Sequence, residues 1–211
     1  MNTPIPSKRY NSTRLVIVAV AAAVSLAVVF ALVGGKSSSK PKVPGETQPV
    51  TIVGSALKKF ADGTDPMVGT KAPTLEGKAF DGSARSITPG DGKATLVLFV
   101  AHWCPHCQRE VPRIVAWEQA GQVPAGLQIR VVSTSVDPAS GNYPASAWLA
   151  KVGVTDPVMA DDDKSSAAAA YGLPGFPYFV LLRADGSVAK RFSGEIEAAD
   201  LTKLINEALA S

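Results

Sequence analysis

The sequence concentrates its chemistry in one pentapeptide, Trp-Cys-Pro-His-Cys at residues 103–107, which contains both cysteines of the 211-residue chain. An almost wholly apolar run, residues 94–101, precedes it and predicts a buried central strand. Residues 108–119 follow it with apolar side chains at helical spacing. This order predicts a strand, a C-x-x-C sequence and a helix, with Cys104 at the helix N-terminus.

The start of a helix favours the reactive form of a cysteine. The first N–H groups of a helix lack partners within the helix and carry partial positive charge, so they stabilise a thiolate. Pro105 suits the first helical turn because it has no N–H group, and a protonated His106 would add a cation beside Cys104. Cys107 lies one turn further along, where it can attack a mixed disulfide. We therefore predict Cys104 as the nucleophile and Cys107 as the resolving thiol.

The two cysteines belong to a longer pattern, W-C-x-x-C-x-x-E-x-P, which also contains Trp103, Glu110 and Pro112. In this pattern the chain resembles the thioredoxin-like thiol–disulfide oxidoreductases, in particular the membrane-anchored TlpA/ResA/DsbE type. The Pro-His dipeptide between the cysteines is instead similar to that of DsbA-type oxidases. The resemblance implies a redox-active Cys104–Cys107 disulfide, with no metal and no cofactor.

Residues 66–211 are predicted to form one α/β domain. The order β-α-β-α-β-β-α is that of the thioredoxin-like fold, a central mixed sheet flanked by helices. Residues 68–83, with a hairpin turn at 80–83, are expected to add short N-terminal strands. The further strands are expected at 127–136, 158–160, 179–182 and 188–192, and the further helices at 142–151, 165–171 and 197–210.

Pro177 stands directly before an apolar strand, a position at which a proline requires an explanation. In thioredoxin-like folds a cis-proline loop faces the C-x-x-C sequence, and the resemblance places Phe176 and Pro177 in that loop. Its backbone can pair with an extended substrate segment. We therefore expect Phe176, Pro177 and Trp103 to contact the substrate.

Two sets of carboxylates are candidates for a functional role. Thioredoxins hold a buried carboxylate six residues before the first cysteine, where this chain has Leu98. Glu110 is the substitute candidate for relaying the proton of the resolving thiol, and a solvated Glu110 or one paired with Arg113 is the alternative.

Residues 161–163, three aspartates, are expected to be solvated at the N-terminus of the following helix.

Residues 15–33 carry no charge and form a stretch about long enough to cross a membrane as a helix. We predict an uncleaved, single-pass signal anchor, with a cleaved signal sequence as the alternative. Basic residues stand on both sides of the stretch, so they do not decide its orientation. We expect residues 1–14 in the cytoplasm and the catalytic domain outside the cytoplasmic membrane.

Residues 34–65 are predicted to link the anchor to the domain. Their first half is rich in Gly, Ser, Lys and Pro, which bury no core, so it is expected to be a flexible tether. Residues 56–61 are expected to form a short helix. The domain itself is expected to begin near Pro66.

The direction of electron flow stays open at this point. The family that the chain resembles is associated with reduction of apocytochrome or envelope-protein disulfides. A thiolate stabilised by His106 instead makes the cysteine pair a stronger oxidant. We lean to oxidation. The expected partners are exported cysteine-containing proteins and a membrane protein that recycles the cysteine pair. A net charge of only +3 without a basic stripe argues against nucleic acid.

Two other functions use the same residues. A copper(I) carrier could bind its metal through His102, Cys104, His106 and Cys107, because copper(I) prefers thiolate ligands. A peroxiredoxin-like enzyme would share the fold, but the P-x-x-x-T-x-x-C pattern of that class is missing. Both alternatives rank below thiol–disulfide exchange.

Overall fold

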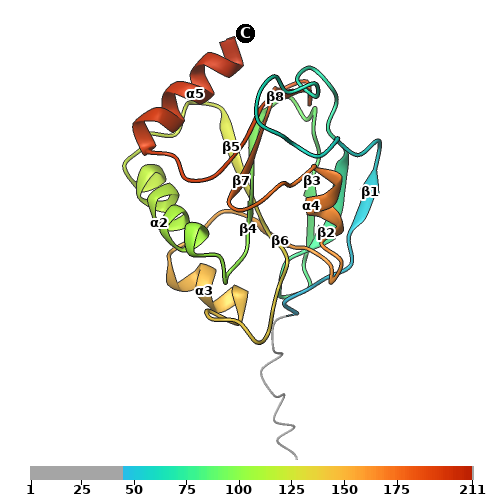
Figure 1. The fold of residues 1–211 in the computed structure, drawn as a ribbon, viewed down its shortest axis with the longest axis vertical. Coiled ribbons are helices and arrows are strands. Elements are labelled where there is room, and N and C mark those ends of the chain that lie inside the picture. The colour runs from blue at the N-terminus through green and yellow to red at the C-terminus, as the bar shows by residue number, and fades with distance from the viewer. Residues whose placement is uncertain (1–44, 211) are drawn as a thin grey trace, which may run out of the picture. The chain divides into compact units, whose positions relative to one another are not determined.

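A mixed eight-stranded sheet runs through residues 45–210, the part of the chain that the computed structural model describes (Figure 1). The strand order is β1-β2-β6-β5-β4-β7-β8, and β3 pairs with β2. The strands are β1 (Thr51–Val53), β2 (Thr74–Lys78), β3 (Ala84–Ile87), β4 (Ala94–Val100), β5 (Leu127–Ser133), β6 (Val158–Ala160), β7 (Tyr178–Leu182) and β8 (Val188–Ser193).

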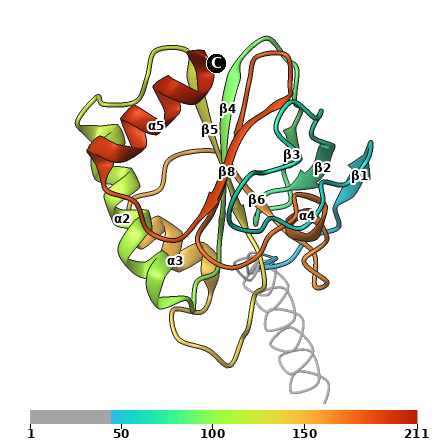
Figure 2. The same cartoon turned by 45° about the horizontal axis from the view of Figure 1, so that its top comes forward.

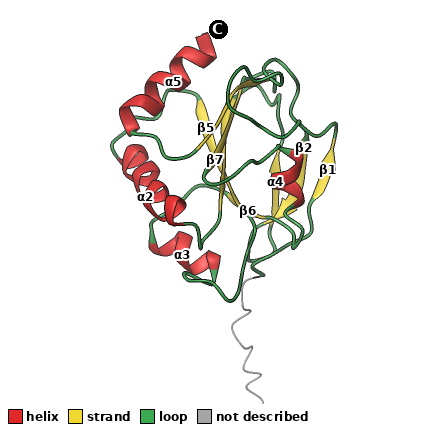
Figure 3. Cartoon of the chain, viewed as in Figure 1, coloured by secondary structure: helices red, strands yellow, loops and turns green. Residues whose placement is uncertain are grey.

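Helices cover both faces of this sheet. One face carries α2 (Pro105–Gln119), α3 (Ala145–Lys151) and α5 (Ala198–Ala210), and the other carries α4 (Ser166–Ala170) (Figures 1 and 2). Along the chain, the strands from β4 onward alternate with helices until the β7–β8 hairpin (Figure 3). The predicted order of strands and helices is therefore confirmed, and the short N-terminal strands are β2 and β3.

Strand β4 lies in the middle of the sheet, and both of its faces are buried. It pairs in parallel with β5 and antiparallel with β7. Leu96, Leu98 and Val100 pack into the core beneath α2 and α5, whereas Val97 and Phe99 pack into the core on the α4 side. A strand buried on both faces needs the continuous apolar run that the sequence contains.

The N-terminal part of the prediction falls largely outside the described residues. The predicted tail (1–14), the predicted anchor (15–33) and residues 34–44 of the predicted linker belong to this part. Within residues 45–210, no helix is both long enough and apolar enough to span a bilayer.

Residues 45–65 differ from the linker that was predicted over 34–65. They pack on the domain: β1 pairs with β2, Leu57 is buried, and the Asp65 carboxylate binds the buried Arg191 at 2.6 and 2.8 Å. The expected helix at 56–61 is absent, because the N–H groups of Leu57 and Phe60 donate to carbonyls at the end of α4 and just beyond it. These contacts are long-range, so local composition did not indicate them.

Asp161 is buried, in contrast to the solvated position that was expected. Its carboxylate accepts hydrogen bonds from the N–H groups of Asp162, Ala167 and Ala168 and from the hydroxyl of Thr134. Burial raises the pKa of Asp161, and these hydrogen bonds oppose that rise. Its side chain therefore holds the start of α4 against β5.

Candidate active site

Cys104 caps the N-terminus of α2, as the sequence predicted. Its extended backbone conformation precedes Pro105 at the first helical position, and its carbonyl accepts the N–H of Gln108 at 3.0 Å. Its residue surface is only 5% exposed. The sulfur therefore lies at the positive end of the helix with little solvent around it.

Cys107 lies one turn further along α2 and is completely buried. Burial is the main reason that the pKa of its thiol is raised, and the nearby Cys104 and Glu110 add to the rise. Both cysteines are free thiols in this structure. The pair thus combines a partly accessible sulfur at the helix end with an inaccessible one behind it.

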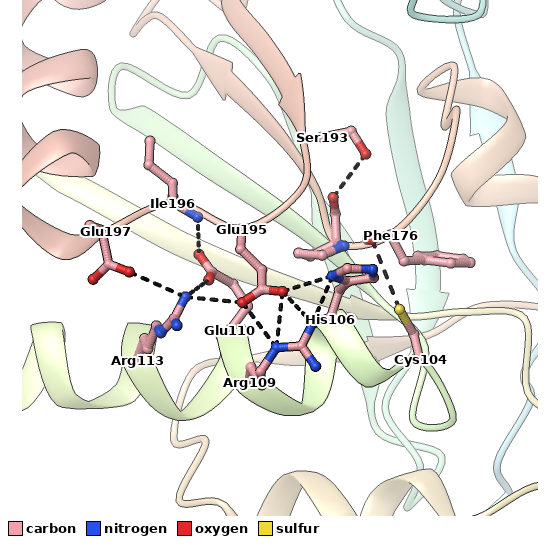
Figure 4. Close-up of polar contacts among 11 residues, drawn as sticks. Cys104, His106, Arg109, Glu110, Arg113, Phe176, Ser193, Glu195, Ile196 and Glu197 are labelled. Atoms are coloured by element: carbon pink, nitrogen blue, oxygen red, sulfur yellow. Dashed lines mark hydrogen bonds and ion pairs between the residues drawn. The ribbon is translucent and has the colours of Figure 1, made fainter.

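A cis peptide bond joins Phe176 to Pro177, as predicted from the resemblance. The loop faces the cysteines, because the Cys104 thiol points at the Phe176 carbonyl oxygen at 3.9 Å (Figure 4). A second cis bond, Tyr143–Pro144, precedes α3 and was not predicted. The expected meeting of the C-x-x-C sequence and the cis-proline loop is therefore present.

Trp103 forms one wall of the site. Its indole N–H donates to the Ser135 carbonyl at 2.7 Å, and its ring meets that of Phe176 edge-on at 5.8 Å between centroids. Trp103 is 37% exposed, so part of the ring remains available to a partner. The three residues expected to contact substrate thus lie together around Cys104.

His106 shares a carboxylate partner with two arginine side chains. Its Nδ1 lies 2.7 Å from Oε1 of Glu195, a residue in the loop between β8 and α5 (Figure 4). Arg109 donates to the same carboxylate at 2.6 Å and Arg113 at 3.1 Å. The Arg109 hydrogen bonds, followed by that of His106, lower the pKa of Glu195 to about 2, so it is ionised at neutral pH.

Glu110 is fully buried, which excludes the solvated alternative. One of its oxygens accepts the N–H of Ile196 at 3.2 Å, and the other lies 3.5 Å from Nη1 of Arg113. Burial raises its pKa against the opposing effects of these contacts. Its position one turn past Cys107 suits a proton relay, and its contact to Arg113 is long, at 3.5 Å.

His102 is a structural residue in this fold. It is completely buried; its Nδ1–H donates to the Gly141 carbonyl at 2.8 Å, and its Nε2 accepts the Asp137 N–H at 3.1 Å. Both ring nitrogens are therefore occupied, which removes one of the four ligands of the copper(I) alternative. Within residues 45–210, no group of three or more His, Cys, Asp or Glu side chains is arranged to hold a metal ion.

A surface pocket of about 390 Å³ adjoins the site. It is lined by residues 60–62, His106, residues 174–176 and residues 193–194. Residues 60–62 come from the segment that was predicted as linker. The pocket offers space for a polypeptide side chain beside the cis-proline loop.

The residues that sequence analysis missed are Glu195 and Arg109. Glu195 lies 89 positions from His106, and only the fold brings the two together. The available signal was the i, i+3, i+7 spacing of His106, Arg109 and Arg113, which puts three basic groups on one helix face. Such a face at a reactive centre calls for a carboxylate partner from another element.

The family sequence model described as Redoxin matches residues 67–205. The thiol:disulfide interchange protein HelX of Rhodobacter capsulatus is 28% identical over 57% of this chain and 63% of its own length. The thiol-disulfide oxidoreductase ResA of Geobacillus thermodenitrificans is 25% identical over 67% of this chain and 78% of its own. The chain thus spans less than two thirds of HelX, and it covers 30% of protein disulfide-isomerase erp38 of Neurospora crassa, which it also matches.

Solved structures show the same architecture. A putative thiol:disulfide interchange protein DsbE from Chlorobium tepidum superposes with a TM-score of 0.55 at 28% identity. The match covers 67% of this chain and 97% of that one. Together with the family match, this similarity confirms the predicted thioredoxin-like fold.

Proposed function

Because the chain belongs to the redoxin family, we propose that it is a thiol–disulfide oxidoreductase that exchanges disulfides with exported cysteine-containing proteins. The observation that carries this proposal is the position of Cys104 at the start of α2, facing the cis-proline loop, with the buried Cys107 one turn behind. This arrangement places one sulfur at the helix end beside the loop that would meet a protein substrate, and it keeps the other for the second step.

The exchange proceeds in two balanced steps. When the pair reduces a substrate, the Cys104 thiolate attacks one sulfur of the substrate disulfide, and the other substrate sulfur leaves as a thiolate and takes up a proton. Cys107 then loses its proton and attacks the Cys104 sulfur, which releases the substrate as a dithiol and closes the Cys104–Cys107 disulfide. Two electrons pass from the pair to the substrate, and the reverse order oxidises a substrate.

The direction that we propose is reduction. A His106 cation beside the thiolate would favour oxidation, but His106 and Arg109 share the ionised Glu195. Basic groups that are paired with a carboxylate stabilise a thiolate less than free cations do. Oxidation remains the second candidate, favoured by the Pro-His dipeptide, because that dipeptide resembles the active site of DsbA-type oxidases.

The proposed location is the outer side of the cytoplasmic membrane, with residues 15–33 as a single-pass anchor. The charge-free sequence of that stretch supports this proposal. A membrane protein would then return the cysteine pair to its working redox state after each cycle.

The reduction potential of the cysteine pair tests the function and its direction together. We expect a value near or below about −250 mV for the full chain equilibrated in redox buffers, in the range of a reductant. A value near or above about −180 mV would mean a donor of disulfides. A pair that never closes into a disulfide would contradict thiol–disulfide exchange altogether.

Glu110 is the proposed proton acceptor for Cys107. The thiol of Cys107 has a raised pKa, so its attack on Cys104 needs a base within the buried region. Glu110→Gln keeps an acceptor for the Ile196 N–H but cannot take a proton. We expect it to slow resolution of a preformed Cys104 mixed disulfide about 100-fold at neutral pH, measured in a single turnover.

Arg113→Gln is the matched control for Glu110→Gln, because it breaks the ion pair and keeps the carboxylate. We expect it to slow the same step far less. Equal losses in the two variants would show that the contact, and not proton transfer, matters.

A further inference from the structure

The loop between β8 and α5 carries the carboxylate of Glu195 into the active site, and the exchange mechanism above assigns that carboxylate no step. The loop is fixed on both sides of Glu195. The Gly194 N–H donates to the Pro177 carbonyl at 2.9 Å, and the Ile196 N–H donates to Glu110 at 3.2 Å. Gly194 has a φ of 100°, a conformation that glycine adopts without strain, and this turn directs the chain toward α2.

Three basic side chains of α2 converge on this carboxylate (Figure 4). Arg109 approaches it through Nη2 at 2.6 Å and Nε at 3.1 Å, Arg113 through Nη1 at 3.1 Å, and His106 through Nδ1 at 2.7 Å. The His106 Nδ1 also lies 2.9 Å from Arg109. An ionised carboxylate only accepts hydrogen bonds, so the Nδ1 proton belongs to the bond with Glu195.

These basic groups belong to the helix that begins at Cys104. The hydrogen bond to Glu195 is the main cause that raises the pKa of Arg109, and the negative charge of a Cys104 thiolate adds to the rise. Left unpaired, Arg109 would stabilise a Cys104 thiolate and favour the dithiol form of the pair. The carboxylate of Glu195 offsets this charge, whereas the carboxylate of Glu197 lies 3.6 Å from Arg113 and is largely exposed.

We propose that Glu195 is a positioning residue that binds His106 and Arg109, offsets their positive charge near Cys104 and thereby keeps the cysteine pair reducing. This inference rests on the proposed thiol–disulfide exchange and adds the residue that sets its potential. The Cys-Pro-His-Cys sequence is then not sufficient for a strong oxidant, because a carboxylate from the β8–α5 loop counters its basic surroundings.

Glu195→Gln in the full chain tests the proposal, since the amide keeps the size of the side chain and removes its charge. We expect the equilibrium with glutathione to shift about tenfold toward the dithiol, which raises the potential by about 30 mV.

Three further variants separate this role from general effects of charge and folding. Glu197→Gln removes a carboxylate from the same region without touching His106 or Arg109, and we expect a shift below about twofold. Glu195→Asp restores the charge and should bring the equilibrium back to within about threefold of the unmodified chain. In an Arg109→Gln background, the effect of Glu195→Gln should fall by more than half.

The outcomes distinguish this inference from the proposed function. An unchanged potential in Glu195→Gln, or equal shifts in the Glu195 and Glu197 variants, would overturn the role of Glu195 while leaving disulfide exchange intact. If no disulfide forms in the unmodified chain either, the proposed function fails and the inference fails with it.

Discussion

Cys107→Ser is expected to abolish turnover and to leave Cys104 joined to its substrate in a mixed disulfide. Cys104 is the sulfur at the helix end, so its attack on a substrate does not need the second cysteine. The next step does need it, because Cys107 is the only other cysteine of the chain and lies one turn behind. Non-reducing electrophoresis and the mass of the trapped species measure the outcome.

Cys104→Ser is the matched control for the trapping experiment. It removes the accessible sulfur and leaves Cys107 without exposed surface, so we expect neither turnover nor a trapped species. Turnover in Cys107→Ser would mean that substrate thiols resolve the mixed disulfide. Trapping on Cys107 in the Cys104 variant would reverse the assigned roles.

Asp65→Ala is expected to destabilise the domain by about 3–5 kcal/mol, the usual cost of removing one partner from a buried ion pair. The Arg191 side chain is completely buried, and Asp65 is the carboxylate that binds it, at 2.6 and 2.8 Å. The variant therefore leaves a positive charge in the core beside Phe60. Denaturant unfolding of the full chain measures the loss.

Asp62→Ala provides the control for Asp65→Ala. Asp62 is exposed and lies three residues away in the same segment, so we expect its loss to change the stability by less than about 0.5 kcal/mol. Similar losses in the two variants would contradict a specific role for the buried pair. A loss below about 1 kcal/mol in Asp65→Ala would show that solvent reaches Arg191.

The contribution of Asp65 should also depend on pH. Hydrogen bonding from Arg191 is the main cause that lowers the pKa of Asp65 in the folded state. A carboxyl group with a lowered pKa stabilises the fold above its unfolded value of about 3.9 and loses this contribution as pH falls through its folded value. The difference between Asp65→Ala and the unmodified chain should therefore shrink below about pH 4.

The sequence predicted the features that depend on a few consecutive residues. The apolar run at 94–101, the C-x-x-C sequence and the proline before β7 each lie in a few consecutive residues, and the structure has the expected strand, helix start and cis bond at these positions. Long-range features were missed, because composition indicates which residues avoid water but not which partner they meet. Glu195 and Asp65 are ordinary surface residues by composition, and both bind side chains far away in the sequence.

Burial of polar groups was the other source of error. The three aspartates at 161–163 were predicted to be solvated, but Asp161 is buried with four hydrogen-bond donors around its carboxylate. A buried carboxylate is tolerated when such donors are present. Their presence depends on how α4 packs against the end of β5, and no local sequence pattern indicates that packing.

The packing of residues 45–65 sets where the smallest autonomous folding unit can start. A fragment that begins at Pro66 would lack β1 and the carboxylate of Asp65, and its Arg191 would be buried without that partner. The same contacts engage the backbone in hydrogen bonds that shield peptide bonds from proteolysis. A protease that releases an intact catalytic domain should therefore leave residues 45–65 uncut, and should not cut at the boundary that composition indicates.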